Sequence, residues 1–469
     1  MGVLVMLADG PEDESKETPT IVDAKGRVDP ADMARWLLSQ RHFLAFYDDP
    51  TELYYYSDGT YHRGGGPLAE AMLEARIEDK ANIANVREAL AHVRRMRAGP
   101  RSMVDDGTDW LCLRNGIVNV RTGEFSPHTP MRVFLTRLPV AYDPAATCPK
   151  VDRFFAEIVP PEDVPLLYEA IANCLLPGYP IQKAFMFVGN GNNGKSTYLG
   201  LVREFLGREN CSAIALQDLD RNRFASSELY GKLANICPDI SSSELRRTST
   251  FKGLTGGDLL TCEAKYQRPF VFSNRAKLLY SCNTVPLTED ESNAFYRRWV
   301  LVDFPNSFEG AAAKLNLLDE LTAPAELSGL LNKVIPLCAR LLEQGGFSGG
   351  GTTEATRLKY IRLSDPVYCW FEVACRVDSG GIGVHGEEIG PPTVRKADLY
   401  KAYVDYCKAE GIPAKSDKAF NRRLLELVPT ISEVRVKEGG HFVRCWRGIE
   451  LLDEGTIAQN KAQSNLFQF

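Results

Sequence analysis

The chain lacks several features that would assign it to a well-marked class of protein. Its 469 residues hold no apolar run close to the ~20 residues that cross a bilayer, so we expect no membrane helix. Residues 1–6 are apolar but lack the basic flank and the length of a secretory signal, so we expect none. No CxxC pair occurs, and the twelve cysteines and six histidines are dispersed. This spacing argues against a metal cage and favours reduced thiols in a cytoplasmic protein.

An excess of positive charge is also lacking. The chain has 55 Lys and Arg against 61 Asp and Glu, a net charge of −6, so any nucleic-acid site must be local. Hydrophobic residues make up 44% and charged residues 25%, which is ordinary for globular proteins and excludes wholesale disorder. At ~150 residues per domain, this length predicts about three domains.

The first part of the chain combines helical and strand patterns. Residues 1–28 are polar and acidic and are expected to form a flexible tail. Residues 29–147 are expected to form a mainly helical domain with short strands. Its helices are predicted at 31–38, 67–75 and 82–97, a hairpin turns at Asp58-Gly59, and a compact β meander covers 110–125.

The rest of the chain divides at a glycine-rich stretch. Residues 148–345 alternate strand and helix patterns, which predicts an α/β sheet domain. A linker is expected at 346–363, because five of residues 344–353 are glycine. In 364–452, helices at 366–376, 394–410 and 417–427 precede two strand candidates, which suggests a winged helix. Residues 453–469 are expected to form a tail. The predicted fold is therefore a multidomain α/β chain.

The strongest motif is a phosphate-binding loop that follows an apolar strand pattern and opens a helix pattern. It fits GxxxxGK[ST] and consists of Gly189, Asn190, Gly191, Asn192, Asn193, Gly194, Lys195, Ser196 and Thr197. Glycines let backbone N–H groups converge on phosphate oxygens, and the helix start adds positive potential. Lys195 is expected to reach the β- and γ-phosphates, Ser196 to bind Mg²⁺, and Thr197 to cap the helix or contact the α-phosphate.

A nucleotide hydrolase also needs groups that hold the metal and position water. Asp239 ends an apolar run and is the best candidate for the acid, although it could instead be a capping residue; Glu244 is the fallback. Asn283 ends another strand pattern and could hold the attacking water or simply form a turn. Arg297 and Arg298 precede a third apolar strand pattern. They could lie on a solvated edge, or they could present a guanidinium to a neighbouring subunit's γ-phosphate.

Together these elements resemble superfamily 3 helicases, in particular the D5-like primase–helicase branch of phages, plasmids and poxviruses. The resemblance rests on Phe251-Lys-Gly-Leu-Thr-Gly-Gly-Asp258, on Tyr280-Ser-Cys-Asn283 and on Phe295-Tyr-Arg-Arg-Trp299. Trp110 to Glu124 looks like the N-terminal module of that branch, and the downstream winged helix is typical of it. The resemblance covers most of residues 30–450.

The resemblance implies an AAA+-like ATPase that uses ATP and Mg²⁺ and forms a homo-oligomeric ring on single-stranded DNA, with a hexamer as the expected size. It gives Asp239 the Walker B role, Asn283 the sensor role, and Arg298, with Arg297 beside it, the role of the finger acting on a neighbour. It also implies a DNA-contacting hairpin at 260–270, where Lys265, Tyr266 and Arg268 would track phosphates and stack on a base. The alternative is an exposed hairpin tip with no role in DNA binding.

Two departures from the family pattern alter the expectation. Asp239 stands alone after a proline where the family often has paired acids, so the residue that activates water stays open. About 30 residues precede the predicted helical domain, and they contain no Asp-x-Asp site, so we expect this chain to make no primers alone and to rely on a separate primase.

The C-terminal unit has a charge opposite to that of the whole chain. Residues 394–447 hold 12 Lys and Arg and seven Asp and Glu, a local net charge of +5. Lys418, Arg422 and Arg423 lie in the first half of a predicted helix, the part that enters the major groove in helix-turn-helix proteins. Contact with another protein through a solvated basic face is the alternative.

The leading interpretation is an ATP-dependent replicative DNA helicase of a virus, provirus or plasmid, acting on single-stranded, forked or origin DNA. If the source is viral, the expected location is the host cytoplasm. One alternative is a P-loop DNA motor or replication initiator that hydrolyses ATP without strand separation. Another is a DNA-binding regulator that uses ATP only as an assembly switch. The N-terminal domain is expected to act as a collar that stabilises the ring.

Overall fold

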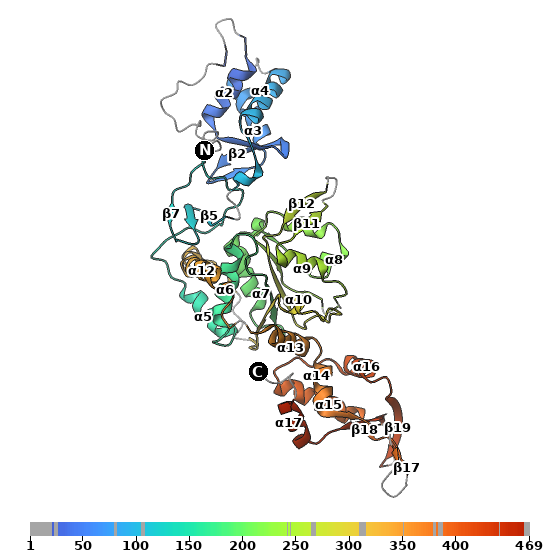
Figure 1. The fold of residues 1–469 in the computed structure, drawn as a ribbon. Helices are drawn as coiled ribbons and strands as arrows, with labels where there is room; N and C mark the ends of the chain where they lie inside the picture. Colours follow the sequence, from blue (N-terminus) through green and yellow to red (C-terminus); the bar gives the residue numbers. More distant parts are fainter. Residues whose placement is uncertain are drawn as a thin grey trace.

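The computed structural model describes residues 21–22, 27–78, 82–104, 108–241, 243, 245–263, 269–308, 316–349, 351–378, 381–382, 388–439 and 441–463. Figure 1 shows an elongated arrangement, with the N-terminal elements at one end, a parallel sheet in the middle and the C-terminal helices at the other end. Within the described ranges, no helix is long and apolar enough to cross a membrane. All twelve cysteines are free thiols.

The N-terminal region contains more strand than the sequence predicts. Three helices pack beside a four-stranded sheet of order β3-β2-β1-β4, and a three-stranded sheet follows. The helices are α2 (Pro30–Gln40), α3 (Gly65–Ile77) and α4 (Ile83–Met96); the strands are β1 (Phe43–Phe46), β2 (Asp49–Ser57), β3 (Thr60–His62), β4 (Ala98–Gly99), β5 (Trp110–Leu113), β6 (Gly116–Asn119) and β7 (Phe125–Ser126).

The hairpin and the meander of this region are confirmed, and its three helices lie where the sequence predicts them, beside strands β1 and β4, which the sequence did not predict. The unexpected strand β1 has all four residues buried. A fully buried strand shows no alternation of apolar and polar residues, and a run of four is too short to distinguish from a buried piece of helix.

The central region carries one five-stranded parallel sheet of order β14-β8-β13-β10-β9. The prediction of a multidomain α/β chain is confirmed, and this sheet fits a P-loop core. Its strands are β8 (Ala184–Val188), β9 (Cys211–Ser212), β10 (Ala234–Cys237), β13 (Lys277–Cys282) and β14 (Trp299–Asp303). Strands β8 and β13 are buried along their whole length, as expected for parallel strands covered on both faces.

Helices cover both faces of this sheet (Figure 1). The buried hydrophobic residues of this region form two clusters. The helices are α5 (Pro149–Ile158), α6 (Val164–Leu175), α7 (Lys195–Leu206), α8 (Asp218–Arg221), α9 (Ser249–Gly256), α10 (Asn293–Tyr296), α11 (Leu317–Leu321) and α12 (Pro324–Gln344). A separate antiparallel hairpin, β11 (Leu259–Cys262) with β12 (Phe270–Ser273), stands where the sequence predicts one. Its tip, with Lys265, Tyr266 and Arg268, lies outside the described residues, as do residues 1–20 of the expected tail.

The C-terminal region has the predicted helices and strand pair. It contains α13 (Thr353–Ser364), α14 (Pro366–Ala374), α15 (Lys396–Ala409), α16 (Asp417–Leu427) and α17 (Glu454–Gln463), with β18 (Thr393–Arg395), β19 (Ser432–Glu438) and β20 (His441–Arg447) in the order β18-β20-β19. Two short pairs complete it: β15 (Cys375–Val377) with β21 (Ile449–Leu451), and β16 (Gly381–Ile382) with β17 (Glu388–Ile389).

Two segments expected to lack structure carry helices. Within the expected linker, α13 buries Tyr360, whose hydroxyl donates to Pro286 O at 2.8 Å. Within the expected tail, α17 packs on α14, and its Asn460 side chain donates to Val373 O at 3.0 Å. Contacts with residues far away in the sequence hold both segments in place as helices. The amino-acid composition of the segments does not reveal such contacts.

Candidate nucleotide-binding site

The loop between β8 and α7 has the geometry of a phosphate-binding loop. Gly194 (φ 88°) and Gly191 (φ 30°) adopt the left-handed backbone conformation that favours glycine. A Cβ at Gly189 would lie 2.5 Å from the carbonyl oxygen of Phe304, and a Cβ at Gly194 would lie 2.6 Å from Ile158. The loop can therefore close tightly only with glycine at these positions, and it exposes Asn190, Gly191 and Asn192 beside the start of α7.

Lys195 is folded back onto this loop. Its Nζ donates to Gly189 O at 2.5 Å and to Asn193 Oδ1 at 3.1 Å, and the residue is only 5% exposed. Burial lowers the pKa of this ammonium, whereas Cys282 and Asp239 act to raise it. A carbonyl and an amide oxygen are neutral partners, so a triphosphate would compete well for this cation.

Asp239 and Asn283 leave the sheet on the same edge and at the same level as this loop. Strand β13 lies between β8 and β10, with Cys282 opposite Val188 and Tyr280 opposite Cys237. In parallel strands this register places the residues that follow each strand side by side. Asp239 and Asn283 are both exposed, as is Ser196 at the start of α7.

The donor set at this edge fits Mg²⁺ and a triphosphate. The hydroxyl of Ser196 and the carboxylate of Asp239 are hard oxygen ligands of the kind that Mg²⁺ takes beside substrate phosphates. The other groups at this edge are Lys195, the amide of Asn283 and the backbone N–H groups of the loop. Glu244, the fallback acid, lies outside the described residues. Thr197 is partly exposed on the first turn of α7.

The two arginines lie at the opposite edge of the sheet. Strand β14 pairs with β8 from Trp299 opposite Ala184 to Asp303 opposite Val188, and Arg298 precedes it. At ~3.3 Å per residue, the five residues of β14 put about 15 Å between these arginines and the phosphate-binding loop of the same chain. They are therefore too far away to act on the phosphates bound by their own protomer.

The structure separates Arg297 from Arg298. Arg298 is 7% exposed; its Nε donates to Thr255 Oγ1 at 2.9 Å, and its Nη1 donates to the carbonyl oxygen of Ala294. Burial, with the charge of Arg297 adding to it, lowers the pKa of Arg298. Arg297 is exposed at the end of α10. The sequence favours Arg298 as the group offered to a neighbour, whereas the geometry favours Arg297.

A large cavity beside the loop was not predicted from the sequence. It has a volume of about 830 Å³, and Gly189 and Asn190 lie on its wall. Its other walls come from β14 and the residues that follow it, from α13 and from residues 410–413. Lys359 of α13 pairs with Asp303 across 2.9 Å in this wall. The sequence signal for this cavity is the pair Lys359 and Arg362 within the expected linker. This pair indicates a cavity wall only once α13 is known to be a helix.

The predicted DNA-contacting residues of α16 fall into two groups. Lys418 and Arg422 are exposed and lie four residues apart on one face of the helix. Arg423 instead binds the carboxylate of Asp365 through Nε and Nη2 at 2.9 and 2.8 Å. Asp365 is buried and also accepts from the Tyr368 N–H at the start of α14. Arg423 therefore joins two helices, which differs from the predicted DNA contact.

Comparison with known proteins places two family models on the chain. One, described as "D5 N terminal like", matches residues 31–160, and the other, described as a "Family of unknown function (DUF5906)", matches residues 187–298. The second match contains the phosphate-binding loop, Asp239, Asn283 and both arginines.

Three viral proteins are similar to part of the chain. "Putative helicase L207/L206" of Acanthamoeba polyphaga mimivirus is 23% identical over 217 residues, 44% of this chain and 22% of that protein. "Putative helicase 121R" of Invertebrate iridescent virus 3 is 23% identical over 223 residues, which are 44% of this chain and 24% of that protein. "Putative helicase 022R" of Frog virus 3 (isolate Goorha) is 24% identical over 283 residues, 55% and 25%. The chain thus spans about a quarter of the length of these relatives.

Solved structures of the NrS-1 C-terminal region are also similar over most of the chain. The A-form apo structure is 14% identical, covers 89% of this chain and 98% of that one, and has a TM-score of 0.45. A second A-form apo structure of the region is 12% identical, covers 90% and 100%, and has a TM-score of 0.47. Scores at this level are too low to transfer an arrangement of domains.

Proposed function

The chain belongs to the D5-like primase–helicase family, and we propose that it hydrolyses ATP to translocate on single-stranded DNA and separate its strands. The observation that carries the proposal is the placement of the candidate site residues at the two edges of one parallel sheet. Lys195, Asp239 and Asn283 share its carboxyl edge, and Arg297 stands exposed at its amino edge. The helicase names of the viral relatives support the same activity.

Hydrolysis starts from the contacts that the loop already makes. Lys195 exchanges Gly189 O and Asn193 Oδ1 for the β- and γ-phosphate oxygens, while the loop N–H groups fix the triphosphate. Ser196 and Asp239 would hold Mg²⁺, which when bound neutralises charge on the phosphates. The Asn283 amide would orient the attacking water. The nucleoside would lie in the cavity that Gly189 and Asn190 border.

Completion of this site requires a second protomer. Arg297 lies about a strand length from its own loop, so it can meet a γ-phosphate only across a subunit interface. A closed ring, with a hexamer as the expected size, gives every site one such arginine. The β11–β12 hairpin would then contact DNA in the ring.

The C-terminal unit is proposed to be a winged helix that contacts origin or forked DNA. The order α14, β18, α15, α16, β19, β20 with the sheet order β18-β20-β19 supports this proposal. Lys418 and Arg422 of α16 are its proposed DNA contacts. An initiator that hydrolyses ATP without unwinding would use the same surface, so strand separation itself must be measured.

The test is ATP hydrolysis with and without single-stranded DNA, together with unwinding of a forked substrate by the same preparation. We expect DNA-stimulated hydrolysis and unwinding, both lost in Lys195→Ala. Hydrolysis without unwinding would leave the initiator or DNA motor, and wild-type hydrolysis by Lys195→Ala would contradict the nucleotide site.

A further inference from the structure

A second cavity, separate from the nucleotide site, is lined by arginines from two segments of the chain. Its volume is about 320 Å³, and its walls are Gln217, Asp220, Arg221, Leu245, Arg246 and Arg247. Arg221 ends α8, whereas Arg246 and Arg247 belong to the connection between β10 and α9. These described wall residues include three arginines and one aspartate, so their summed formal charge is positive.

The backbone around this cavity is fixed by hydrogen bonds. The amide of Gln217 donates to the carbonyl oxygens of Ser241 and Ser243 at 2.7 and 3.3 Å, which ties α8 to the residues after β10. Leu245 N donates to Leu287 O at 2.8 Å, and Leu245 forms a parallel bridge with Thr288. The two segments that carry the arginines are therefore held in place before any ligand binds.

A nearby carboxylate is already paired with another cation. Asp290, two residues beyond that bridge, accepts from Lys252 Nζ at 2.8 Å and from the hydroxyl of Thr248. Although burial acts to raise the pKa of Asp290, these hydrogen bonds hold it well below its ordinary value. Asp290 is therefore already paired with Lys252.

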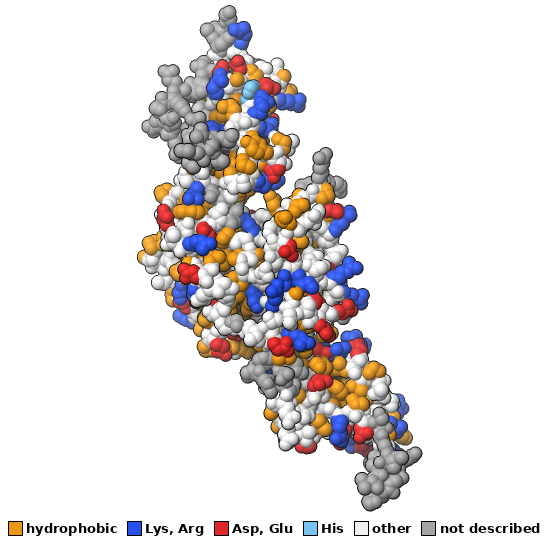
Figure 2. All heavy atoms as spheres, viewed as in Figure 1, with side chains coloured by type: hydrophobic (Ala, Val, Ile, Leu, Met, Phe, Trp, Pro, Cys, Tyr) orange, Lys and Arg blue, Asp and Glu red, His pale blue; other side chains and the backbone are white. Residues whose placement is uncertain are grey.

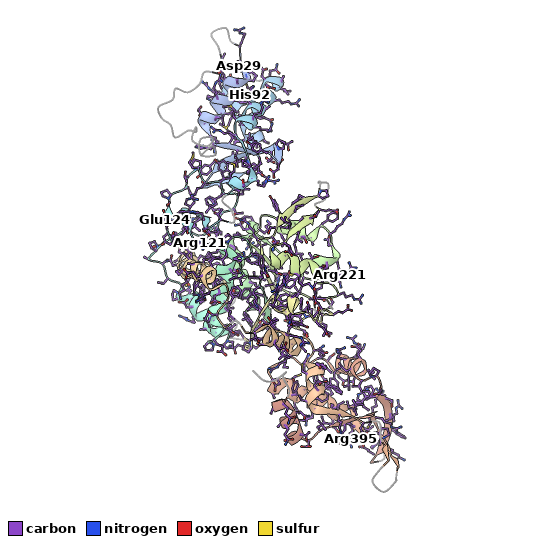
Figure 3. All side chains as sticks on the ribbon, in the orientation of Figure 1. Asp29, His92, Arg121, Glu124, Arg221 and Arg395 are labelled. Atoms are coloured by element: carbon purple, nitrogen blue, oxygen red, sulfur yellow. The ribbon has the colours of Figure 1, made fainter. Side chains whose placement is uncertain are left out.

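The cavity lies beside the β11–β12 hairpin. Arg223, two residues after Arg221, pairs with Glu263 at the end of β11 across 3.4 Å. The ring of Tyr230, farther along the same connection, contacts Phe270 of β12 with centroids 5.2 Å apart. Figure 1 shows α8, α9 and the hairpin grouped on one side of the central region, and Figure 3 places Arg221 at its outer edge.

Basic side chains extend over the same face. Figure 2 shows Lys and Arg side chains gathered across the central region between α10 and α8. Arg221, Arg246 and Arg247 are all exposed. Guanidinium groups bind phosphate and carboxylate oxygens in a bidentate manner, so three of them around one cavity favour an anionic ligand, such as a phosphate group, over a neutral one.

We propose that the cavity between α8 and residues 245–247 binds a backbone phosphate of single-stranded DNA, through Arg221, Arg246 and Arg247. The inference rests on the proposed function in that the polymer is DNA, and it adds a contact outside the hairpin tip and outside α16. Its position beside the hairpin lets one strand touch both. ATP carries the same phosphate chemistry, so the test must separate the two sources.

The test is the salt dependence of binding to a fluorescent oligothymidylate, measured by anisotropy without ATP. Arg221→Gln/Arg247→Gln removes two of the three guanidinium groups around one phosphate; at ~0.7 per neutralised phosphate, the slope of log K against log salt should shrink by up to ~0.7. Affinity near 0.1 M salt should fall about fivefold. The matched control is Arg203→Gln/Arg208→Gln, which removes the same charge from exposed side chains beside Glu204 in the same sheet domain.

The outcomes separate the cavity from the nucleotide site. Slopes equal to wild type in the cavity variant, or equal losses in the control, would overturn the inference. Loss of DNA-independent ATP hydrolysis with unchanged oligothymidylate affinity would assign the cavity to ATP and also overturn it. Wild-type protein that binds oligothymidylate through the cavity but hydrolyses no ATP would contradict the proposed function and leave the inference standing.

Discussion

The central sheet and the C-terminal unit each present two adjacent arginines, and in each pair the structure uses the two differently. Arg298 is buried against Thr255, whereas Arg297 beside it is exposed. Arg423 is bound to Asp365, whereas Arg422 beside it is exposed. Arg422 and Arg423 are successive residues of α16, so their side chains point about 100° apart, whereas Arg297 and Arg298 follow α10 in a turn. The exposed member of each pair is the one available to a partner.

The two arginines with internal partners, Arg298 and Arg423, also differ from each other. The partners of Arg298 are a hydroxyl and a carbonyl oxygen, both neutral, whereas the partner of Arg423 is a buried carboxylate. Removal of Arg423 leaves a buried charge behind, whereas removal of Arg298 leaves only polar groups. The cost of removal should therefore be larger for Arg423.

The largest expected effect concerns the exposed arginine of the sheet domain. Arg297→Ala should lower kcat for DNA-stimulated ATP hydrolysis about 1,000-fold, because a guanidinium that meets the γ-phosphate is worth ~10³–10⁵ in rate. The melting temperature should match wild type, since Arg297 is exposed at the end of α10. Near-normal turnover in Arg297→Ala would contradict the claim that the exposed arginine of this pair acts on the γ-phosphate.

Next in size is the buried pair of the C-terminal unit. Arg423→Gln should lower the free energy of unfolding by about 2–3 kcal/mol, because it strips the partner from Asp365 while Arg423 itself keeps part of its exposure. Denaturant unfolding of the full chain measures this loss. Arg422→Gln is the matched control and should stay within ~0.5 kcal/mol of wild type while weakening duplex binding.

A smaller loss is expected from Arg298→Gln. The hydroxyl of Thr255 and the carbonyl oxygen of Ala294 lose a charged donor, which should cost about 1–2 kcal/mol of unfolding free energy. ATP hydrolysis should fall far less than in Arg297→Ala. If Arg298→Gln instead lost turnover with unchanged stability, the roles of the two arginines would be reversed.

The last prediction concerns Lys277, a buried cation whose hydrogen-bond partners among the described residues are carbonyl oxygens. Lys277 donates to the carbonyl oxygens of Leu176, Gly178 and Arg275, and burial lowers its pKa to about 7. The unfolded lysine keeps its ordinary, higher pKa and so binds one more proton above pH ~7, which makes stability rise with pH.

The slope should reach up to ~1.4 kcal/mol per pH unit in the wild type between pH ~7 and ~8.5 and be flatter in Lys277→Met. Chemical unfolding of both proteins across this window gives the difference, and the other titrating groups cancel. Identical slopes would show that Lys277 stays protonated in the fold.

Much of the fold could be predicted from local patterns. The apolar run of 184–188, the glycines that follow it and the turn at Asp58-Gly59 each act through backbone geometry that a short segment determines. The roles of Arg298 and Arg423 could not be predicted, because Thr255 and Asp365 lie far away in the sequence. The helices α13 and α17 could not be predicted for the same reason, because Tyr360 and Asn460 bind residues that are far away in the sequence.

The candidate site shows the same division. The phosphate-binding loop could be identified from spacing, and the strand ends at Asp239 and Asn283 from apolar runs. The two cavities could not, since residues such as Gly189 and Lys359, or Arg221 and Arg247, meet only after folding.

The central claim is that each ATP site takes Arg297 from the next protomer, and mixing of two inactive variants tests it most directly. Lys195→Ala retains Arg297, and Arg297→Ala retains the phosphate-binding loop, so mixed rings contain some complete sites. We expect DNA-stimulated ATP hydrolysis to return when the two variants are combined, while each alone stays inactive. A mixture as inactive as its components, in rings shown to contain both variants, would contradict the claim.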